Sequence, residues 1–253
     1  MMGKAGASPQ GFGPDLVVVH LYPDLLMTYG DRGNVLTIAR RAEWRGFRVR
    51  IVGVTRGEEL PEHSDLIVIG GGSDRVQVLV GADLIARRAE LAELAASGTV
   101  ILGVCGGYQL MGDRYTAVDG QQVDGLGLLD VTTAAGADRI VGRVHARASF
   151  DGASFEVAGF ENHAGRTYLG PGARALATVG KGRGNNGTDG TEGAAQGGVV
   201  GTYLHGPVLP TSPAFADALL VRALVRATGG APLAALDDRL EVAACTAAQT
   251  LRR

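Results

Sequence analysis

Residues 100–109 read VILGVCGGYQ, and the fold of the chain can be predicted outward from this stretch. Its first five residues, apolar around one glycine, predict a short buried strand. Gly106 and Gly107 follow Cys105 directly, and because glycine adopts backbone angles closed to other residues, they allow a sharp turn into a helix that begins near Tyr108. Cys105 is therefore predicted to lie on an elbow between a strand and a helix.

An elbow of this kind suits a nucleophile. The side chain projects from the sheet edge, the N-terminus of the following helix stabilises a thiolate, and the N–H of Gly106 is free to donate to a developing oxyanion. Gly103, Cys105 and Gly107 have the spacing of the serine elbow G-x-S-x-G, with a thiol in place of the hydroxyl. A free cysteine at a strand end is often only a small buried residue, but the flanking glycines and the polar Gln109 favour a nucleophile.

The composition limits the classes of function. The chain has 253 residues, enough for a full core, and a formal net charge of -2, which leaves no basic surface for nucleic acid or an anionic membrane. Its two cysteines give neither a disulfide framework nor a metal-binding pattern, and Cys245 is predicted to be inert. No apolar run is long enough to span a bilayer. We expect a cytoplasmic protein without a metal site, with a disordered leader at residues 1–14 and a single domain at residues 15–253.

In the first half of the chain, predicted strands alternate with predicted helices. Apolar runs bounded by turn residues predict buried strands at residues 16–22, 65–70 and 100–104, and a further strand is predicted at residues 48–54. Amphipathic spacing predicts helices from the loop at residues 29–34 to about Arg45, at residues 82–97, and through Leu110. This alternation predicts an α/β fold: a doubly wound, mostly parallel sheet with helices on both faces, flavodoxin-like, whose functional site lies at the carboxyl edge of the sheet.

Three features near the first strand bear on that site. His20 lies within the strand and is predicted to be a packed core residue rather than a ligand. Asp31 either caps the following helix or lies at the carboxyl edge of the sheet. That helix is expected to bury Leu36, Ala39 and Ala42 on one face.

The loop at residues 70–75, GGGSDR, follows the third predicted strand. Because its glycines carry no Cβ, its backbone N–H groups can approach a ligand closely, which suits an anion or an oxyanion. A plain tight turn is the alternative. The chain has no G-x-x-x-x-G-K-[ST] pattern, so this loop is not a nucleotide-phosphate loop.

Beyond residue 127 the pattern changes to short strands joined by Gly and Asp turns, which predicts a small antiparallel extension with strands at residues 127–132, 139–150 and 155–161. The polar cluster at residues 160–167 contains His163, which is either a second site residue or a hydrogen-bonding loop residue, and we favour the loop residue. The glycine-dense stretch at residues 180–198 is predicted to be a mobile surface loop.

His205 ends the next predicted strand, at residues 199–204, and is followed by Gly206 and Pro207. A histidine in this position is displayed at a strand end rather than packed within the strand, so His205 is the candidate base for Cys105. Helices are predicted from Pro213 to Thr228 and from about Asp238, and they complete the chain.

Taken together, these motifs resemble class I glutamine amidotransferases. GVCGGYQ at residues 103–109 resembles the family signature G-x-C-x-G-x-Q, while GFENHAGRT at 159–167 and YLHGP at 203–207 resemble the branch that includes cobyric acid synthase. Within this branch, YGDRGN at 29–34 and GGGSDR at 70–75 extend the resemblance to the glutaminase subunits of lipid II isoglutaminyl synthase. The motifs span most of the chain.

The resemblance implies a glutaminase that hydrolyses L-glutamine to glutamate and ammonia through a cysteinyl thioester. It also implies a heterodimer with a Mur-ligase-like subunit, MurT, and amidation of the α-carboxyl of D-glutamate in the stem peptide of lipid II. Amidation of a carboxylate needs activation, and this chain carries no nucleotide-binding motif. No cofactor is therefore expected in the chain itself, and ATP and Mg²⁺ are expected on the partner.

The resemblance also suggests roles for individual residues. Cys105 is the nucleophile and His205 the base, and the oxyanion hole is formed by the N–H of Gly106 and one from Gly71 or Gly72. The substrate glutamine would be held by Gln109 and, at its α-carboxylate, by Arg139, because arginine binds carboxylates in a bidentate manner; Arg166 and Arg75 are competitors.

The sequence does not decide which acidic residue orients the imidazole of His205 and so completes a catalytic triad with Cys105. Many class I amidotransferases have Glu two residues after the catalytic histidine, where this chain has Pro207. Asp31, Glu161 or an acidic residue of the partner could orient the imidazole instead. Three alternatives to the main interpretation also stay open: a glutaminase for another acceptor such as a cobyrinate-type corrinoid, a different cysteine hydrolase, and a regulatory subunit without activity.

Overall fold

The computed structural model describes residues 15–116 and 119–250. The expected leader at residues 1–14 lies outside the described residues. The strands form one 11-stranded sheet in the order β2-β1-β3-β4-β11-β10-β9-β7-β5-β6, and β8 pairs with β7. Its parallel part consists of β2 (Arg48–Val54), β1 (Asp15–Leu21), β3 (Leu66–Ile69), β4 (Val100–Val104) and β11 (Val199–Thr202). The predicted doubly wound, mostly parallel sheet is confirmed.

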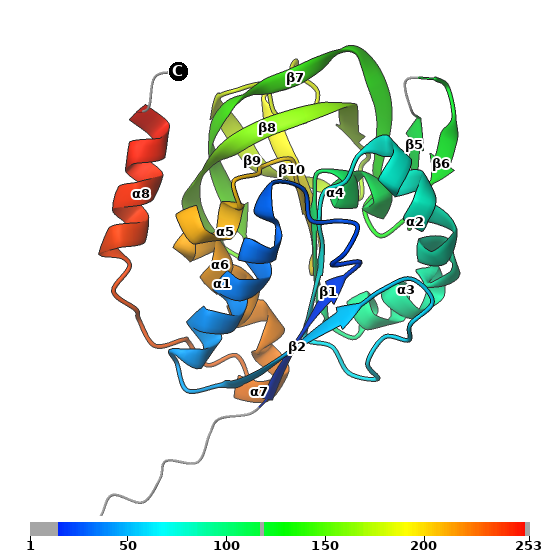
Figure 1. The fold of residues 1–253 in the computed structure, drawn as a ribbon. Helices are drawn as coiled ribbons and strands as arrows, with labels where there is room; N and C mark the ends of the chain where they lie inside the picture. Colours follow the sequence, from blue (N-terminus) through cyan, green and yellow to red (C-terminus); the bar gives the residue numbers. More distant parts are fainter. Residues whose placement is uncertain (1–14, 117–118, 251–253) are drawn as a thin grey trace, which may run out of the picture.

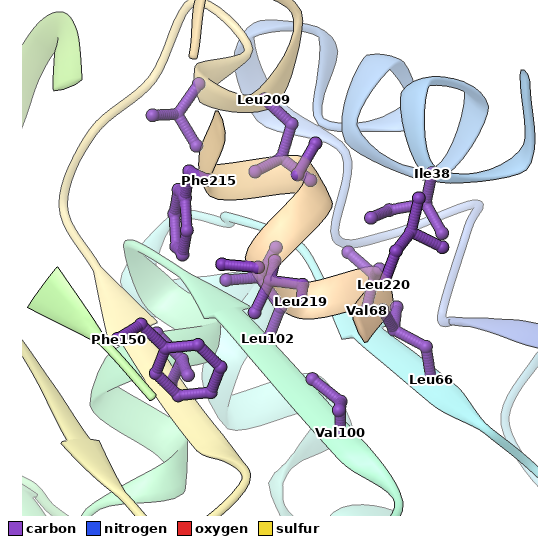
Figure 2. Close-up of a cluster of buried hydrophobic side chains, with 14 of the residues drawn as sticks. Ile38, Leu66, Val68, Val100, Leu102, Phe150, Leu209, Phe215, Leu219 and Leu220 are labelled. Carbon is purple, nitrogen blue, oxygen red and sulfur yellow. The ribbon is translucent and has the colours of Figure 1, made fainter. Parts of the chain in front are cut away.

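Helices cover both faces of this parallel part (Figure 1). One face carries α1 (Arg32–Glu43), α5 (Val208–Thr211) and α6 (Pro213–Ala223), and the other carries α2 (Asp74–Ala86), α3 (Arg88–Ala96) and α4 (Gly106–Met111). Alternate residues of each strand face opposite ways, so Leu66 and Val68 pack under α1 and α6 (Figure 2), while Ile67 and Ile69 pack on the other side. Burial on both faces explains why β3 and β4 are buried and apolar throughout, whereas β2, at the edge of the sheet, contains two arginines and is largely exposed.

Two helices differ from the prediction. In α1 the buried face is Val35, Ile38, Ala39 and Ala42, whereas Leu36 is 41% exposed, because the i, i+3, i+4 stripe starts one residue earlier than expected. The single helix predicted at residues 82–97 is two helices, α2 and α3, which meet at Arg87.

The antiparallel extension is larger than predicted. Its strands are β5 (Arg114–Thr116), β6 (Gln122–Asp124), β7 (Val131–Phe150), β8 (Ala153–Leu169), β9 (Arg174–Lys181) and β10 (Thr191–Gln196). β7 and β8 form a long hairpin whose turn, Asp151-Gly152, has positive φ at both residues (47° and 82°), as a tight two-residue hairpin turn requires. The polar cluster at residues 160–167 therefore lies within β8 and is not a loop.

The stretch at residues 180–198 is not the open surface loop that its glycine content suggested. It contains β10, and the side chains of Asn185 and Asn186 in the preceding turn are buried. The Asn186 side-chain oxygen accepts the N–H groups of Thr188 and Asp189, at 3.0 and 3.1 Å. Side-chain hydrogen bonds organise this turn in place of apolar burial.

The C-terminal region packs beside α1 and the long hairpin. The helix predicted from Pro213 to Thr228 is two helices, α6 and α7 (Val225–Thr228), separated at Leu224, and α8 (Arg239–Thr250) follows. Arg41 of α1 is only 2% exposed and binds the carboxylates of Asp217 and Asp238, which fastens the segment before α8. Among the described residues, no helix combines the length and apolarity needed to cross a membrane.

Candidate active site

Cys105 lies at the junction of β4 and α4 with φ 51° and ψ -104°. A non-glycine residue with positive φ is strained, by about 1–3 kcal/mol, and such strain concentrates at functional sites. The elbow is held by its neighbours: the Cys105 N–H donates to the Thr202 carbonyl of β11 at 2.8 Å, and a Cβ at Gly107 would overlap the Ile69 carbonyl. The predicted elbow is thus fixed by the two strands that flank β4.

The backbone of the glycine loop passes close to the elbow. The Gly107 N–H donates to the Gly70 carbonyl at 3.1 Å, and a Cβ on Gly106 would lie 3.0 Å from the Gly72 nitrogen. Within the described chain, the N–H groups of Gly72 and Gly106 donate to no acceptor. Two free N–H donors beside a nucleophile are the arrangement that stabilises an oxyanion.

The structure corrects the expectation for Gly71. Its N–H donates to the Asp31 carboxylate at 2.6 Å, so it is not available to an oxyanion. A Cβ on Gly71 would lie 3.0 Å from the His205 ring and 3.4 Å from the Cys105 Cβ. Cys105, His205 and Asp31 therefore converge around Gly71, which needs to be a glycine so that the three side chains can approach.

His205 follows β11, and its backbone pairs with Phe160 of β8 through two hydrogen bonds of 2.8 and 3.1 Å. Its buried ring lies 4.8 Å from the ring of Tyr29 and 5.5 Å from that of Phe160, measured between centroids. Burial by itself lowers the pKa of His205, but Asp31 and Cys105 outweigh it and raise that pKa to about 9. The site therefore favours the imidazolium at neutral pH.

Asp31 is the acidic side chain that faces the imidazole. It occupies the N-cap position of α1 but makes no capping hydrogen bond, because its carboxylate turns toward the site. Oδ1 lies 3.7 Å from His205 Nδ1, and both side chains are fully buried. Of the two roles left open for Asp31, the structure supports the one at the carboxyl edge of the sheet.

Glu161 does not share this role. Its carboxylate accepts the N–H groups of Arg183 and Gly184, at 2.9 and 2.7 Å, and so holds the turn before β10. It neighbours Phe160 in β8, and successive side chains of a strand point to opposite faces, so Glu161 points away from the imidazole. The expectation that it could orient His205 is wrong.

The structure also explains why a proline follows two residues after His205. A Cβ added to Gly33 would overlap the Pro207 ring, which shows how closely this proline packs on the first turn of α1. The same turn carries Asp31, so the proline contact holds the segment after His205 against the element that provides the acid.

A cavity of about 230 Å³ opens in front of the nucleophile. Cys105, His205 and Gly72 line it together with residues of α2 and of the long hairpin. Gln109 also lines it and is fixed from both sides: its Oε1 accepts from Gln77 at 2.9 Å, and its Nε2 donates to the Tyr203 hydroxyl at 3.1 Å.

His163 is more than a loop residue. It lies in β8, lines the cavity, and stacks on Tyr203 with ring centroids 3.6 Å apart. Its Nδ1 donates to the Gly165 carbonyl at 2.8 Å, so the predicted hydrogen-bonding role is present, but it is made from a strand. Through Tyr203, His163 supports the position of Gln109.

Of the three candidate arginines, only Arg139 lines this cavity. Arg166 forms an ion pair with Asp138 at 2.7 Å, and Arg75 is exposed on α2. The Arg139 guanidinium donates to the backbone and side-chain oxygens of Asn162, at 3.2 and 3.1 Å.

Several residues that line the cavity were given no site role from the sequence, among them Tyr29, Asp74, Tyr115 and Asn162. Asn162 donates to the Tyr29 hydroxyl at 2.6 Å, which joins the loop before α1 to the long hairpin. Tyr29 and Asp74 belong to the two loops that follow parallel strands, so the carboxyl-edge rule could have identified them. Tyr115 lies in a short strand that was not predicted.

The fold and site define a class. Residues 17–213 match the family of CobB/CobQ-like glutamine amidotransferase domains, and the chain belongs to this family. The resemblance predicted from the motifs is confirmed.

Curated relatives narrow the class further. The chain is 37% identical over 213 residues to the GatD subunit of lipid II isoglutaminyl synthase (glutamine-hydrolyzing) from Staphylococcus aureus strain N315, covering 84% of this chain and 86% of the relative. It is 35% identical over 218 residues to the same subunit of Streptococcus pneumoniae strain ATCC BAA-255 / R6, covering 85% and 82%. Cobyric acid synthase of Rhodobacter capsulatus is 34% identical over 203 residues, but this match covers 78% of the chain and only 40% of the relative.

Solved structures support the fold alone. The structure of PurLQS from Thermotoga maritima matches with a TM-score of 0.51 at 18% identity, covering 77% of this chain and 88% of that one. A crystal structure of a glutamine amidotransferase matches with the same TM-score and identity, covering 85% and 99%.

Proposed function

We propose that this chain is the glutaminase subunit of a lipid II isoglutaminyl synthase: it hydrolyses L-glutamine and passes ammonia to a Mur-ligase-like partner. The observation that carries the chemistry is the convergence of Cys105, His205 and Asp31 beside two free backbone N–H groups. The assignment to lipid II rests on the GatD relatives, which match along most of their own length as well as most of this chain.

The first chemical step forms a thioester. Because the site favours the imidazolium of His205, the proton of the Cys105 thiol already lies on His205 when glutamine binds, and the Cys105 thiolate attacks the carboxamide carbon. The tetrahedral oxyanion accepts hydrogen bonds from the N–H groups of Gly106 and Gly72. The imidazolium then gives its proton to the amide nitrogen, and ammonia leaves.

The second step releases glutamate. The neutral imidazole of His205 takes a proton from water, and the resulting hydroxide attacks the thioester through the same oxyanion hole. Asp31 stabilises the imidazolium in both steps from its position 3.7 Å from Nδ1. Catalytic hydrogen bonds are often long before substrate binds, and a movement of about 1 Å would close this one.

A partner is required for the product to be used. The relatives are named as subunits, which supports an assembly. Amidation of a carboxylate needs activation, and we assign ATP and Mg²⁺ to the Mur-ligase-like subunit, which would amidate the D-glutamate α-carboxyl of the stem peptide. An ATP-dependent reaction of this kind places the pair in the cytoplasm.

A corrinoid acceptor is the second candidate. The similarity to cobyric acid synthase supports it, but that match spans less than half of the relative, whereas the GatD matches span both chains. The coverage therefore favours the cell-wall acceptor.

The transfer of labelled amide nitrogen from glutamine distinguishes the lipid II acceptor from the corrinoid acceptor. The chain, the partner, ATP, Mg²⁺ and amide-¹⁵N glutamine are incubated with lipid II or with a cobyrinate-type corrinoid, and the acceptors are analysed by mass spectrometry. We expect ¹⁵N in lipid II and none in the corrinoid. Glutamate release with no label in lipid II would contradict the assignment of the acceptor while leaving the glutaminase reaction in place.

A further inference from the structure

Besides its histidines, the cavity is lined by one acidic and one basic side chain, Asp74 and Arg139, and neither has an ion-pair partner among the residues that the structure describes. Asp74, the first residue of α2, is half-buried, and no Lys, Arg or His among the described residues pairs with it. Arg139, on the long hairpin, donates to the amide and carbonyl oxygens of Asn162, and within residues 15–116 and 119–250 it forms no ion pair with a carboxylate. An unpaired anion and an unpaired cation in one cavity form a recognition site for a ligand that carries both charges.

A buried tyrosine lines the cavity together with the two charged side chains. Tyr115 is 1% exposed as a residue and lines the same cavity as Asp74 and Arg139. Its pKa is raised first by burial and then by the Asp74 carboxylate, whereas Arg139 lowers it. Both charges therefore act on the same wall of the cavity, which Asp74, Tyr115 and Arg139 line together.

We propose that Asp74 binds the α-ammonium group of the substrate glutamine while Arg139 binds its α-carboxylate, so that the carboxamide is directed toward Cys105. This inference rests on the proposed glutaminase function and adds to it the recognition of a free α-amino acid. Asp74 donates no proton and takes no part in the bond changes; it is a binding residue. Tyr115, packed against the carboxylate, is a positioning residue.

The position of Asp74 at the start of α2 has an alternative explanation, and the test must distinguish it from binding of the ammonium group. An acidic residue in the first turn of a helix is stabilising by itself, because it interacts with the positive end of the helix dipole. A helix-stabilising role alone would change the stability of the chain and would affect every substrate equally. An ammonium-binding role changes only substrates that carry the ammonium group.

The experiment compares L-glutamine with glutaramate, its analogue without the α-amino group, for the wild-type chain in complex with its partner and for Asp74→Asn. We expect Asp74→Asn to lower kcat/KM for L-glutamine roughly 10- to 100-fold, the effect of losing a hydrogen bond to a charged group, with most of the change in KM. Hydrolysis of glutaramate by the variant should equal that of the wild type. Asp124→Asn, an exposed carboxylate outside the cavity, is the matched control and should change neither substrate.

An equal loss for both substrates, or no loss for L-glutamine, would overturn the inference. A second readout keeps it separate from the proposed function: protection of Cys105 from alkylation by iodoacetamide when L-glutamine binds. If the wild type binds glutamine without hydrolysing it, the proposed function fails. The inference is then decided by the protection experiment alone. We expect the glutamine concentration that protects Cys105 to be roughly 10-fold or more higher for Asp74→Asn than for the wild type. An unchanged concentration would contradict the inference.

Discussion

The parallel and antiparallel parts of the sheet contribute different groups to one cavity. The parallel part provides the reacting groups, Cys105 after β4 and His205 after β11, with backbone N–H donors from the loop after β3. The long hairpin of the antiparallel part provides Arg139 and Asn162, which have no part in the bond changes. The comparison teaches that the reacting groups all come from the parallel part, whereas the long hairpin contributes only to substrate recognition, which it shares with Asp74 of α2. Substitutions in the two parts should therefore have different kinetic signatures.

The largest effect is expected in the parallel part, from Cys105→Ala. Because the nucleophile is removed, glutaminase kcat should fall by at least about 10⁴-fold. Glutamate release, measured with the partner present, checks this. The variant should still bind glutamine, since the walls of the cavity are unchanged. Residual turnover within tenfold of the wild type would show that another group is the nucleophile.

Asp31→Asn should cause the next largest loss of glutaminase activity. The amide cannot stabilise the imidazolium, so we expect kcat to fall roughly 10²- to 10⁴-fold. Because Asp31 helps to raise the pKa of His205 to about 9, its loss should also move the alkaline limb of the pH–rate profile to lower pH. Glu161→Gln is the control from the sequence analysis and should leave that limb in place. If the alkaline limb of the pH–rate profile stays in place in Asp31→Asn, the interaction of Asp31 with His205 is contradicted.

The raised pKa of His205 also links stability to pH. The folded state holds the proton more tightly than an unfolded chain, whose histidine has a pKa near 6.5. The stabilisation is complete below about pH 6.5 and is lost as the pH rises toward 9. Denaturant unfolding of the wild type and of His205→Gln between these pH values should show a pH-dependent difference that disappears above about pH 9.

Substitution in the antiparallel part should act on binding. Arg139→Ala should raise KM roughly 10- to 100-fold and leave kcat nearly unchanged, because Arg139 touches the substrate away from the reacting carbon. Arg75→Ala is the matched control: this arginine is exposed and outside the cavity, so its removal should change neither constant. A fall in kcat with constant KM for Arg139→Ala would break the division between the two parts.

The smallest effect is expected at the tip of the long hairpin. Gly152 has φ 82°, and no atom lies within 4 Å of the place where a Cβ would be. Gly152→Ala should therefore cost only about 1 kcal/mol of unfolding free energy, from the positive φ, and leave the kinetic constants unchanged. Urea denaturation and a glutaminase assay check this. A change in KM would mean that the hairpin tip is coupled to the cavity.

The same comparison explains how much could be predicted from the sequence. In the parallel part, strands buried on both faces have continuous apolar runs, and their carboxyl ends meet at one edge. Cys105 and His205 could therefore be predicted at that edge from the sequence, whereas Asp31 could be predicted there only as one of two possible roles. The choice of Gly72 over Gly71 could not be predicted, because it depends on which N–H the Asp31 carboxylate accepts.

In the antiparallel part the polar residues misled the prediction. Glu161 and His163 are buried within β8, although a cluster of polar residues is typical of a loop. They remain buried because each is hydrogen-bonded: Glu161 by the N–H groups of Arg183 and Gly184, and His163 by the Gly165 carbonyl. These partners are distant in sequence or depend on the strand geometry, so local patterns do not reveal them.

The central claim is that glutamine reacts at Cys105 through a covalent thioester, and trapping the intermediate tests it most directly. The wild-type chain and its partner are quenched with acid during turnover of ¹³C-labelled glutamine, digested, and analysed by mass spectrometry. The account predicts a labelled γ-glutamyl group on the peptide that contains Cys105 and none in Cys105→Ala. Normal glutamate formation with no label on that peptide would contradict it.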